Sequence, residues 1–211
     1  KIYFYLRLVF SSHIADYLIC SSQTTKLDLL KYVPSAVHKA RVYYPGLNRV
    51  SNKSNDNVHH SLPVKYNLYI GDRRPHKNLK KLIKLHIILW ETYHLEEDLI
   101  ICGAPEDFEE FDIIPKKLIR RIHYVANVSD QSLQDLIIQA SSIMLISKYE
   151  GFGLTILEAM NMDCPIISSG TSSLKEVGGN KIEYFDPNNI NDMSERIESL
   201  IYNQEKKKIM I

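Results

Sequence analysis

The sequence predicts an α/β fold in which helices cover both faces of a parallel β-sheet. Three observations support this fold class. Short apolar runs alternate regularly with helical patterns from residue 62 onward. Most of these runs are apolar throughout, as expected of strands that are buried on both faces. Strand–helix alternation gives parallel strands, because each helix carries the chain back across the sheet.

The elements after residue 62 follow in a regular order. Strands are predicted over residues 66–71, 99–103, 122–128, 142–147, 165–169 and 182–185. Helices are predicted over residues 79–93, 130–141, 154–162 and 190–202. Asp130 could cap the second of these helices, and His86 on the apolar stripe of the first is expected to be a satisfied core residue. Ligands of such a sheet should bind at the carboxyl ends of its strands.

The residues before this region are expected to form a separate, smaller unit. It contains predicted strands over 15–20 and 40–44 and a predicted helix over 24–33. The apolar segment 2–10 contains Arg7, and we expect it to be buried, with a helix at a membrane surface as the alternative.

The segment that joins the two parts is polar. Residues 48–61 contain almost no apolar residues and are rich in Asn and Ser, as solvated linkers are. We therefore divide the chain into residues 1–48, a linker over 49–61, and a main domain over 62–211.

Composition limits the function classes. The chain of 211 residues is 45% hydrophobic and 24% charged, which is typical of a soluble globular protein. A net charge of +1 argues against a dedicated nucleic-acid-binding protein, which needs a strong basic excess. The three cysteines, Cys20, Cys102 and Cys164, have no metal-ligand spacing and no disulfide framework, so they favour a reducing compartment. No apolar run approaches the length of a membrane span. A cytoplasmic protein is expected, with the membrane surface as the alternative location.

Two loops at predicted carboxyl ends of strands carry chemically active side chains. The first is residues 69–79, "YIGDRRPHKNL", in which Gly71 ends a strand and a helix begins near residue 78. Arg73 and Lys77 therefore lie near a helix N-terminus, whose free N–H groups attract anions. Two cations at this place suit a diphosphate, and a solvated basic turn is the alternative.

The second loop and its helix, residues 148–160, carry two carboxylates in a segment that is otherwise largely apolar. Gly151 and Gly153 allow the backbone to approach a ligand, and the N–H groups there could bind phosphate oxygens. Glu150 would face the ligand from the loop. Glu158 lies about one and a half turns into the helix, where it could hold two sugar hydroxyls. The alternative for Glu158 is to complement the helix N-terminus or to pair with a core Arg.

The spacing resembles that of a known enzyme family. A Glu-x7-Glu pattern with Gly-Phe-Gly inside it, preceded by an Arg- and Lys-containing loop, is similar to the family 4 retaining glycosyltransferases. The resemblance runs from about residue 15 to residue 202 and continues, in the family's order, through "SDQSLQDLIIQAS", "CPIISS", "SSLKEVGG" and "FDPNNINDM". It implies the two-domain GT-B architecture, with residues 62–211 as the Rossmann-like C-terminal half, which binds the sugar nucleotide.

The resemblance also implies roles for the matching side chains. Arg73 and Lys77 would neutralise the diphosphate as the bond to the donor sugar breaks. Glu150 would contact hydroxyls of the donor sugar, and Glu158 would contact the ribose. Arg73, Lys77 and Glu150 are therefore the expected catalytic residues.

Backbone groups complete the implied donor site. The N–H groups of Phe152, Gly153 and Leu154 would hold phosphate oxygens, and Gly71 and Gly151 belong to the same two loops. Many glycosyltransferases bind a divalent metal through Asp-x-Asp, but no two Asp residues here lie two apart, so neither a metal nor another cofactor is expected.

The implied substrates are a GDP- or UDP-sugar and a glycan or lipid-linked acceptor, as in polysaccharide biosynthesis. Residues 1–48 resemble only the end of the acceptor-binding N-terminal domain and its crossover. The chain is therefore expected to be a fragment that binds the donor without catalysing transfer alone. Two alternatives are a sugar-nucleotide epimerase of the same fold and a non-catalytic module that binds nucleotide sugars.

Three positions depart from the family pattern. Ile146 replaces a usual Pro, Asp163 replaces a Gly that often ends the helix, and Lys175 stands where "SSLPEV" would have Pro. These changes should affect local turns without removing a proposed contact.

Overall fold

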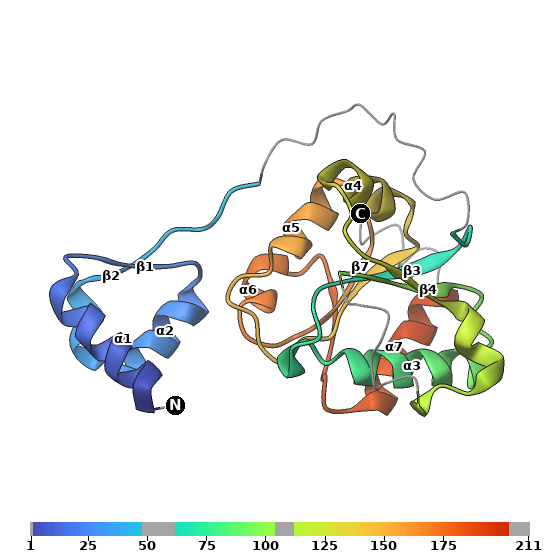
Figure 1. Cartoon of the computed structure of the whole chain (residues 1–211), viewed down its shortest axis with the longest axis horizontal. Helices are drawn as coiled ribbons and strands as arrows, with labels where there is room; N and C mark the ends of the chain where they lie inside the picture. The colour runs from blue at the N-terminus through green and yellow to red at the C-terminus, as the bar shows by residue number, and fades with distance from the viewer. Residues whose placement is uncertain (1, 48–61, 104–111, 203–211) are drawn as a thin grey trace.

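The main part of the chain is built on a six-stranded sheet, which is seen in Figure 1. The computed structural model describes residues 2–47, 62–103 and 112–202. All strand pairs of the main sheet are parallel, and the strand order is β5-β4-β3-β6-β7-β8. The strands are β3 (Tyr66–Ile70), β4 (Asp98–Cys102), β5 (Ile122–Val125), β6 (Ser142–Leu145), β7 (Ile166–Ser169) and β8 (Glu183–Phe185). Each overlaps one of the six predicted strands.

Helices cover both faces of this sheet, which confirms the predicted fold class (Figure 1). The α-helices are α3 (Leu79–Thr92), α4 (Asp130–Gln139), α5 (Leu154–Asn161), α6 (Leu174–Gly178) and α7 (Ile190–Tyr202), and the short 3-10 helices are η2 (Pro75–Lys77) and η4 (Lys116–Arg121). One core contains Leu82 of α3 and Met193 of α7. The other contains Leu136 of α4, Ile156 of α5 and Leu174 of α6. Burial of these side chains on both sides of the strands is the main stabilising term of the fold.

Two local expectations need correction. Ser129, not Asp130, is the N-cap of α4, and its side chain accepts a hydrogen bond from the Ser132 N–H. Asp130 is instead the acidic residue of the first turn, where its charge still favours the helix N-terminus. The helix α6 was not predicted, because its five residues are too few to show a helical period.

His86 is a satisfied core residue, as predicted. Its Nδ1 lies 3.1 Å from the carbonyl oxygen of Leu82, and its Nε2 lies 3.5 Å from the amide nitrogen of Asn67. The Asn67 oxygen accepts in turn from Ser142 at 2.7 Å. The ring is fully buried beside Trp90, and this burial lowers the pKa of His86 to about 4. The imidazole is therefore neutral at physiological pH.

The N-terminal unit is a small βαβ arrangement. It consists of α1 (Ile2–Ile14), β1 (Leu18–Cys20), α2 (Gln23–Tyr32), the 3-10 helix η1 (Pro34–His38) and β2 (Ala40–Val42). The two strands pair in parallel, as their predicted positions on either side of a helix require. The predicted linker over residues 49–61 lies outside the described residues.

The apolar opening segment does not behave as expected. It forms α1, and its side chains are largely exposed: Tyr3 is 73% exposed and Phe10 is 66% exposed. The prediction that this segment is buried is wrong for the described chain, because a two-stranded unit has too little surface to cover the helix. None of the described helices has the length and apolar character that a bilayer crossing requires.

Candidate functional site

The two loops that carry the predicted site residues lie side by side at the carboxyl edge of the sheet. β3 pairs with β4 on one side and with β6 on the other, so the strand order reverses between β3 and β6. The loop after β3 contains Gly71, Arg73 and Lys77, and the loop after β6 contains Glu150 to Gly153. This reversal point is where open α/β sheets bind ligands.

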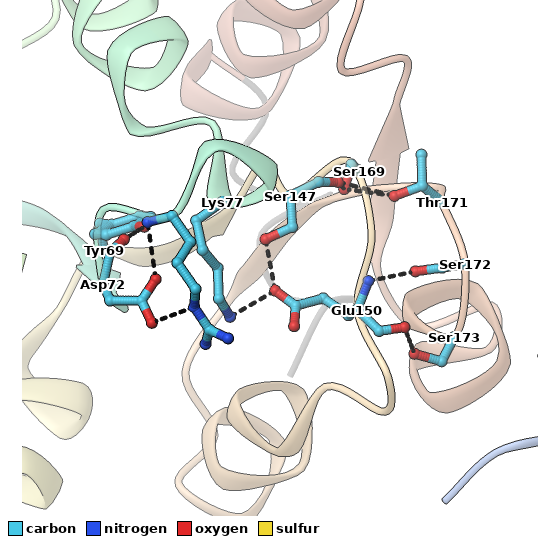
Figure 2. Close-up of polar contacts among 10 residues, drawn as sticks. Tyr69, Asp72, Lys77, Ser147, Glu150, Ser169, Thr171, Ser172 and Ser173 are labelled. Atoms are coloured by element: carbon cyan, nitrogen blue, oxygen red, sulfur yellow. Dashed lines mark hydrogen bonds and ion pairs between the residues drawn. The ribbon is translucent and has the colours of Figure 1, made fainter. Parts of the chain in front are cut away.

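An ion pair joins the two loops. Lys77 Nζ lies 2.7 Å from Glu150 Oε1, and the two side chains are only 18% and 15% exposed (Figure 2). Ser147 Oγ donates to the same carboxylate oxygen at 2.6 Å. The Glu150 carboxylate is therefore satisfied by the protein itself in this structure, which a partly buried charge requires.

The main chain of Glu150 is held as firmly as its side chain (Figure 2). Its N–H donates to Ser172 Oγ at 2.8 Å, and its carbonyl oxygen accepts from Ser173 Oγ at 2.8 Å. Ser172 has φ +48°, a left-handed conformation that is uncommon outside Gly. Sequence reasoning included Ser172 and Ser173 in the segment "SSLKEVGG" but assigned no contact to them or to Ser147. The polar run that follows β7, "GTSS", was the available signal.

Further hydrogen bonds tie the first loop to the end of β6. The Lys148 N–H donates to the His76 carbonyl at 2.7 Å, and Asn78 Nδ2 donates to the Ile146 carbonyl at 3.2 Å. Asn78 is the N-cap residue of α3 and has φ +62°. Ile146 is buried, and its replacement of the family's Pro leaves this carbonyl in place as an acceptor. The relative position of Lys77 and Glu150 is thus set by the backbone.

The two neighbouring arginines of the first loop have different surroundings. Arg74 is exposed, and its Nε lies 2.7 Å from Asp72 Oδ2 while its N–H donates to Asp72 Oδ1 at 3.0 Å. Burial alone would raise the pKa of Asp72, but the hydrogen bonds and charge of Arg74 lower it. Arg73 is half-buried in the same turn, close in sequence to the carboxyl end of β3.

The second loop turns sharply at Gly153. This residue is the N-cap of α5 with φ +103°, and a Cβ there would lie 2.9 Å from a methyl group of Leu174. A side chain here is therefore strained by the backbone conformation and would also require the Leu174 side chain to shift. Gly151 is different, because a Cβ there would only meet Ser21 Oγ at 3.9 Å. Phe152 is buried and Leu154 begins the helix, so their N–H groups belong to the turn and the first helical turn.

Glu158 lines a pocket beside α4 and α5. The pocket has a volume of about 210 Å³. The described residues that line it are Gly46, Leu47, Asp130, Leu133, Gln134, Ile137, Leu154, Glu158, Asn161 and Met162. Burial, and then the charge of Asp130, raise the pKa of Glu158. With two carboxylates and no cation among its described lining residues, the pocket suits a neutral group that donates hydrogen bonds rather than a phosphate.

The predicted site residues are therefore brought together in two places. Lys77 and Glu150 are in contact, with Gly151 to Leu154 continuing the same loop. Glu158 faces a separate pocket, which shares Leu154 with that loop. Within the ranges that the structure describes, no three His, Cys, Asp or Glu side chains gather closely enough to hold a metal ion.

The chain belongs to the family "Glycosyl transferases group 1". The sequence model of this family matches residues 52–211. Among curated proteins it is similar to the O-antigen chain mannosyltransferase B of Escherichia coli, with 35% identity over 138 residues, covering 63% of this chain and 35% of that protein. It is also similar to the O-antigen chain mannosyltransferase RfbU of Salmonella typhimurium, with 25% identity over 205 residues, covering 95% of this chain and 55% of that protein. The chain thus spans about half or less of the length of these relatives.

Solved structures show the same fold. The chain superimposes on Anabaena Alr3699/HepE in complex with UDP-glucose with a TM-score of 0.79 at 15% identity, covering 97% of this chain and 59% of that one. It also superimposes on the C-terminal domain of a group 1 glycosyl transferase, LpcC from Francisella tularensis, with a TM-score of 0.60 at 19% identity, covering 71% of this chain and 82% of that one. The fold is therefore the Rossmann-like fold of the GT-B glycosyltransferases, as the sequence resemblance implied.

Proposed function

We propose that the chain is the donor-binding part of a retaining, family 4 glycosyltransferase. It would bind a nucleoside-diphosphate sugar, whose sugar is transferred to a glycan or lipid-linked acceptor in polysaccharide biosynthesis. Residues 62–211 would be the nucleotide-sugar-binding domain, residues 49–61 a linker, and residues 1–48 the end of the acceptor domain. A cytoplasmic location is proposed, with α1 as a candidate contact to the membrane surface.

The ion pair between Lys77 and Glu150 carries this proposal. Lys77 is suited to a phosphate oxygen and Glu150 to sugar hydroxyls, and their charged atoms lie 2.7 Å apart. In a sugar nucleotide, the bond that breaks joins the sugar to the diphosphate. A ligand that engages both side chains would place this bond directly over the pair.

The remaining parts of the donor fit the neighbouring groups. The N–H groups of Phe152, Gly153 and Leu154 lie at the start of α5, where a helix N-terminus favours phosphate. The pocket of Glu158 shares Leu154 with this turn and would receive the nucleoside, with the ribose hydroxyls donating to the carboxylate. The order of sugar, diphosphate and nucleoside in the donor would then follow the loop into the pocket.

The reaction would depend mainly on stabilising the leaving group. The bond between the anomeric carbon and the diphosphate oxygen breaks and an oxocarbenium-like centre develops. The acceptor hydroxyl oxygen bonds to the same face of the sugar, and its proton passes to the departing diphosphate. Negative charge grows on the departing nucleoside diphosphate. Arg73 and Lys77, already placed in a partly buried loop, would stabilise this charge without a metal ion.

The proposed donor is GDP-mannose, with UDP-sugars as the next candidates. Similarity to two O-antigen mannosyltransferases supports mannose as the sugar. UDP-sugars are included because the similar fold of HepE was solved with UDP-glucose. Either nucleotide offers the diphosphate and ribose for which the site residues are suited.

A thermal-shift panel of nucleoside diphosphates and their sugars tests this proposal. A ligand at 100 times its dissociation constant should stabilise the folded chain by about 2.7 kcal/mol. We expect GDP-mannose or a UDP-sugar to raise the melting temperature, and nucleoside monophosphates to raise it less. If no member of the panel raises it, the donor-binding proposal is wrong.

Product analysis tests the transfer reaction. We expect negligible transfer by this chain alone, because positioning of the acceptor and exclusion of water need both domains of the GT-B architecture. Joining it to the acceptor-binding domain of its own enzyme should restore transfer, with retention at the anomeric carbon in NMR spectra of the product. Robust transfer by the chain alone, or inversion in the joined protein, would contradict the proposal.

A further inference from the structure

The carbonyl oxygen of Gly151 accepts hydrogen bonds from hydroxyl groups of the N-terminal unit. Ser21 Oγ lies 3.0 Å from it, Ser22 Oγ lies 2.9 Å from it, and Thr25 Oγ1 lies 2.9 Å from it. A carbonyl oxygen has two lone pairs, so these three donors supply more hydrogen bonds than it can accept at once. The carbonyl therefore points toward the start of α2.

A carboxylate anchors the same end of α2 to the main domain. Glu176 of α6 accepts from the Gln23 N–H at 2.8 Å, from the Thr24 N–H and hydroxyl at 3.0 Å each, and from the Tyr44 hydroxyl at 2.9 Å. A negative charge at a helix N-terminus is stabilising. Burial alone would raise the pKa of Glu176, but these hydrogen bonds lower it. The start of α2 is thus fixed beside the loop.

Neighbouring residues of the loop face the same way as the Gly151 carbonyl. The Tyr149 hydroxyl donates to Asp28 of α2 at 3.0 Å, and the ring of Phe152 packs 5.9 Å from that of Tyr44. Glu150, between them, contacts Lys77 instead. The loop therefore contacts both parts of the chain. The Glu150 side chain belongs to the proposed donor site, and the Tyr149 and Phe152 side chains contact the N-terminal unit.

Peptide geometry connects the hydrogen bonds at the Gly151 carbonyl to the proposed donor site. In a trans peptide the N–H points opposite to the preceding C=O, and no cis peptide bond occurs among the described residues. Holding the Gly151 carbonyl toward α2 therefore turns the Phe152 N–H away from α2. This N–H is the first of the three groups that we assign to the phosphate.

We propose that Ser21, Ser22 and Thr25, anchored through Glu176, are positioning residues that orient the Phe152 N–H for the donor's diphosphate. This inference rests on the proposed function of the loop. It assigns to the N-terminal unit a part in diphosphate recognition, although none of these four side chains needs to touch the donor. The effect of the three hydroxyl groups should therefore appear only with ligands that contain the diphosphate.

The test uses the full 211-residue chain with a double variant, Ser21→Ala/Thr25→Val, which leaves the N-cap residue Ser22 in place. Titration calorimetry would compare GDP, UDP, guanosine and uridine. Loss of two hydroxyl donors should weaken the binding of GDP and UDP by roughly tenfold. It should change the affinity for guanosine and uridine less than twofold. The matched variant Ser21→Thr/Thr25→Ser keeps both hydroxyls and should bind as wild type does. Hydrogen exchange at the Phe152 amide should be faster in the Ala/Val variant only.

The variant Glu176→Gln gives a second, different signature. This substitution should loosen the whole N-terminal unit, which also supplies Gly46 and Leu47 to the nucleoside pocket. It should therefore weaken the binding of nucleosides as well as of diphosphates. Unchanged diphosphate affinity in the Ala/Val variant, or equal losses for nucleoside and diphosphate in it, would overturn the inference while leaving the proposed function standing. Failure of wild type to bind any nucleoside diphosphate would overturn both.

Discussion

Lys77 Nζ lies 2.7 Å from Glu150 Oε1, although the two residues are 73 positions apart in the chain. Each belongs to a different loop, and the loops meet because β3 and β6 are neighbours in the sheet. The two charges satisfy each other. Under the proposed function, the side chain assigned to the phosphate and the side chain assigned to the sugar already lie side by side.

The first prediction separates the cations of this loop from a solvated basic turn. Arg73→Ala and Lys77→Ala should each weaken nucleoside diphosphate binding by roughly 1.5–3 kcal/mol, the range for hydrogen bonds to charged groups. Titration calorimetry with GDP, UDP and the parent nucleosides checks this, and nucleoside affinity should change far less. Lys80→Ala, at an exposed position of α3, is the matched control. If both variants bind GDP and UDP as wild type does, the loop is only a solvated basic turn and does not bind the diphosphate.

The second prediction separates the two glutamates. Glu158→Gln should weaken nucleosides, diphosphates and sugar nucleotides alike, by about 1 kcal/mol, because all contain ribose. Glu150→Gln should weaken ligands that carry the sugar more than it weakens the diphosphates, because its carboxylate is assigned to sugar hydroxyls and also pairs with Lys77. Calorimetry on both variants with the same ligand series decides between them. Identical losses across all ligands would show that the two side chains do not have separate roles.

The third prediction concerns stability at low pH. Burial lowers the pKa of His86 from 6.5 to about 4, so the unfolded chain takes up this proton at a higher pH than the folded chain. The free energy of unfolding should therefore fall by about 3 kcal/mol from this group as the pH drops from 6.5 to 4. Urea unfolding of wild type and His86→Gln over this range checks the slope. A constant difference between the two proteins from pH 7.5 to pH 4 would show that His86 does not contribute.

The fourth prediction uses a departure from the family pattern. Asp163 follows α5 with φ +51°, at a place where the family often has Gly. Because a left-handed conformation is costly for a residue with a Cβ, Asp163→Gly should stabilise the chain by roughly 0.5–1 kcal/mol. Chemical denaturation measures the change, and Asp163→Ala should give no such gain. A loss of stability in the Gly variant would mean that the Asp side chain contributes more than its backbone costs.

Much of the fold could be predicted from the sequence, because the strands are continuous apolar runs. The run Leu99–Ile101 is fully buried, as such a run requires. α6 could not be predicted, because five residues with a Gly at the end show no period. The exposure of α1 could not be predicted either, since an apolar segment does not reveal how much surface is available to cover it.

The candidate site shows a similar division. Placing the two loops at one edge followed from the alternation of strands and helices, which fixes where parallel strands end. The direct contact between Lys77 and Glu150 did not follow, because strand order and side-chain reach decide it. The hydrogen bonds that join the Glu150 backbone to Ser172 and Ser173, and Gly151 to Ser22, could not be predicted either, since they join residues far apart in the sequence.

The most direct test of donor binding is amide NMR of the 15N-labelled chain during titration with GDP and UDP. The account predicts that the largest shifts occur at Phe152, Gly153 and Leu154 and in the loop that contains Lys77, with the far edge of the sheet unchanged. Addition of the matching sugar nucleotide should extend the shifts to Glu150. Saturable shifts confined to other parts of the chain, or none with either nucleotide, would contradict the central claim that these two loops bind the donor.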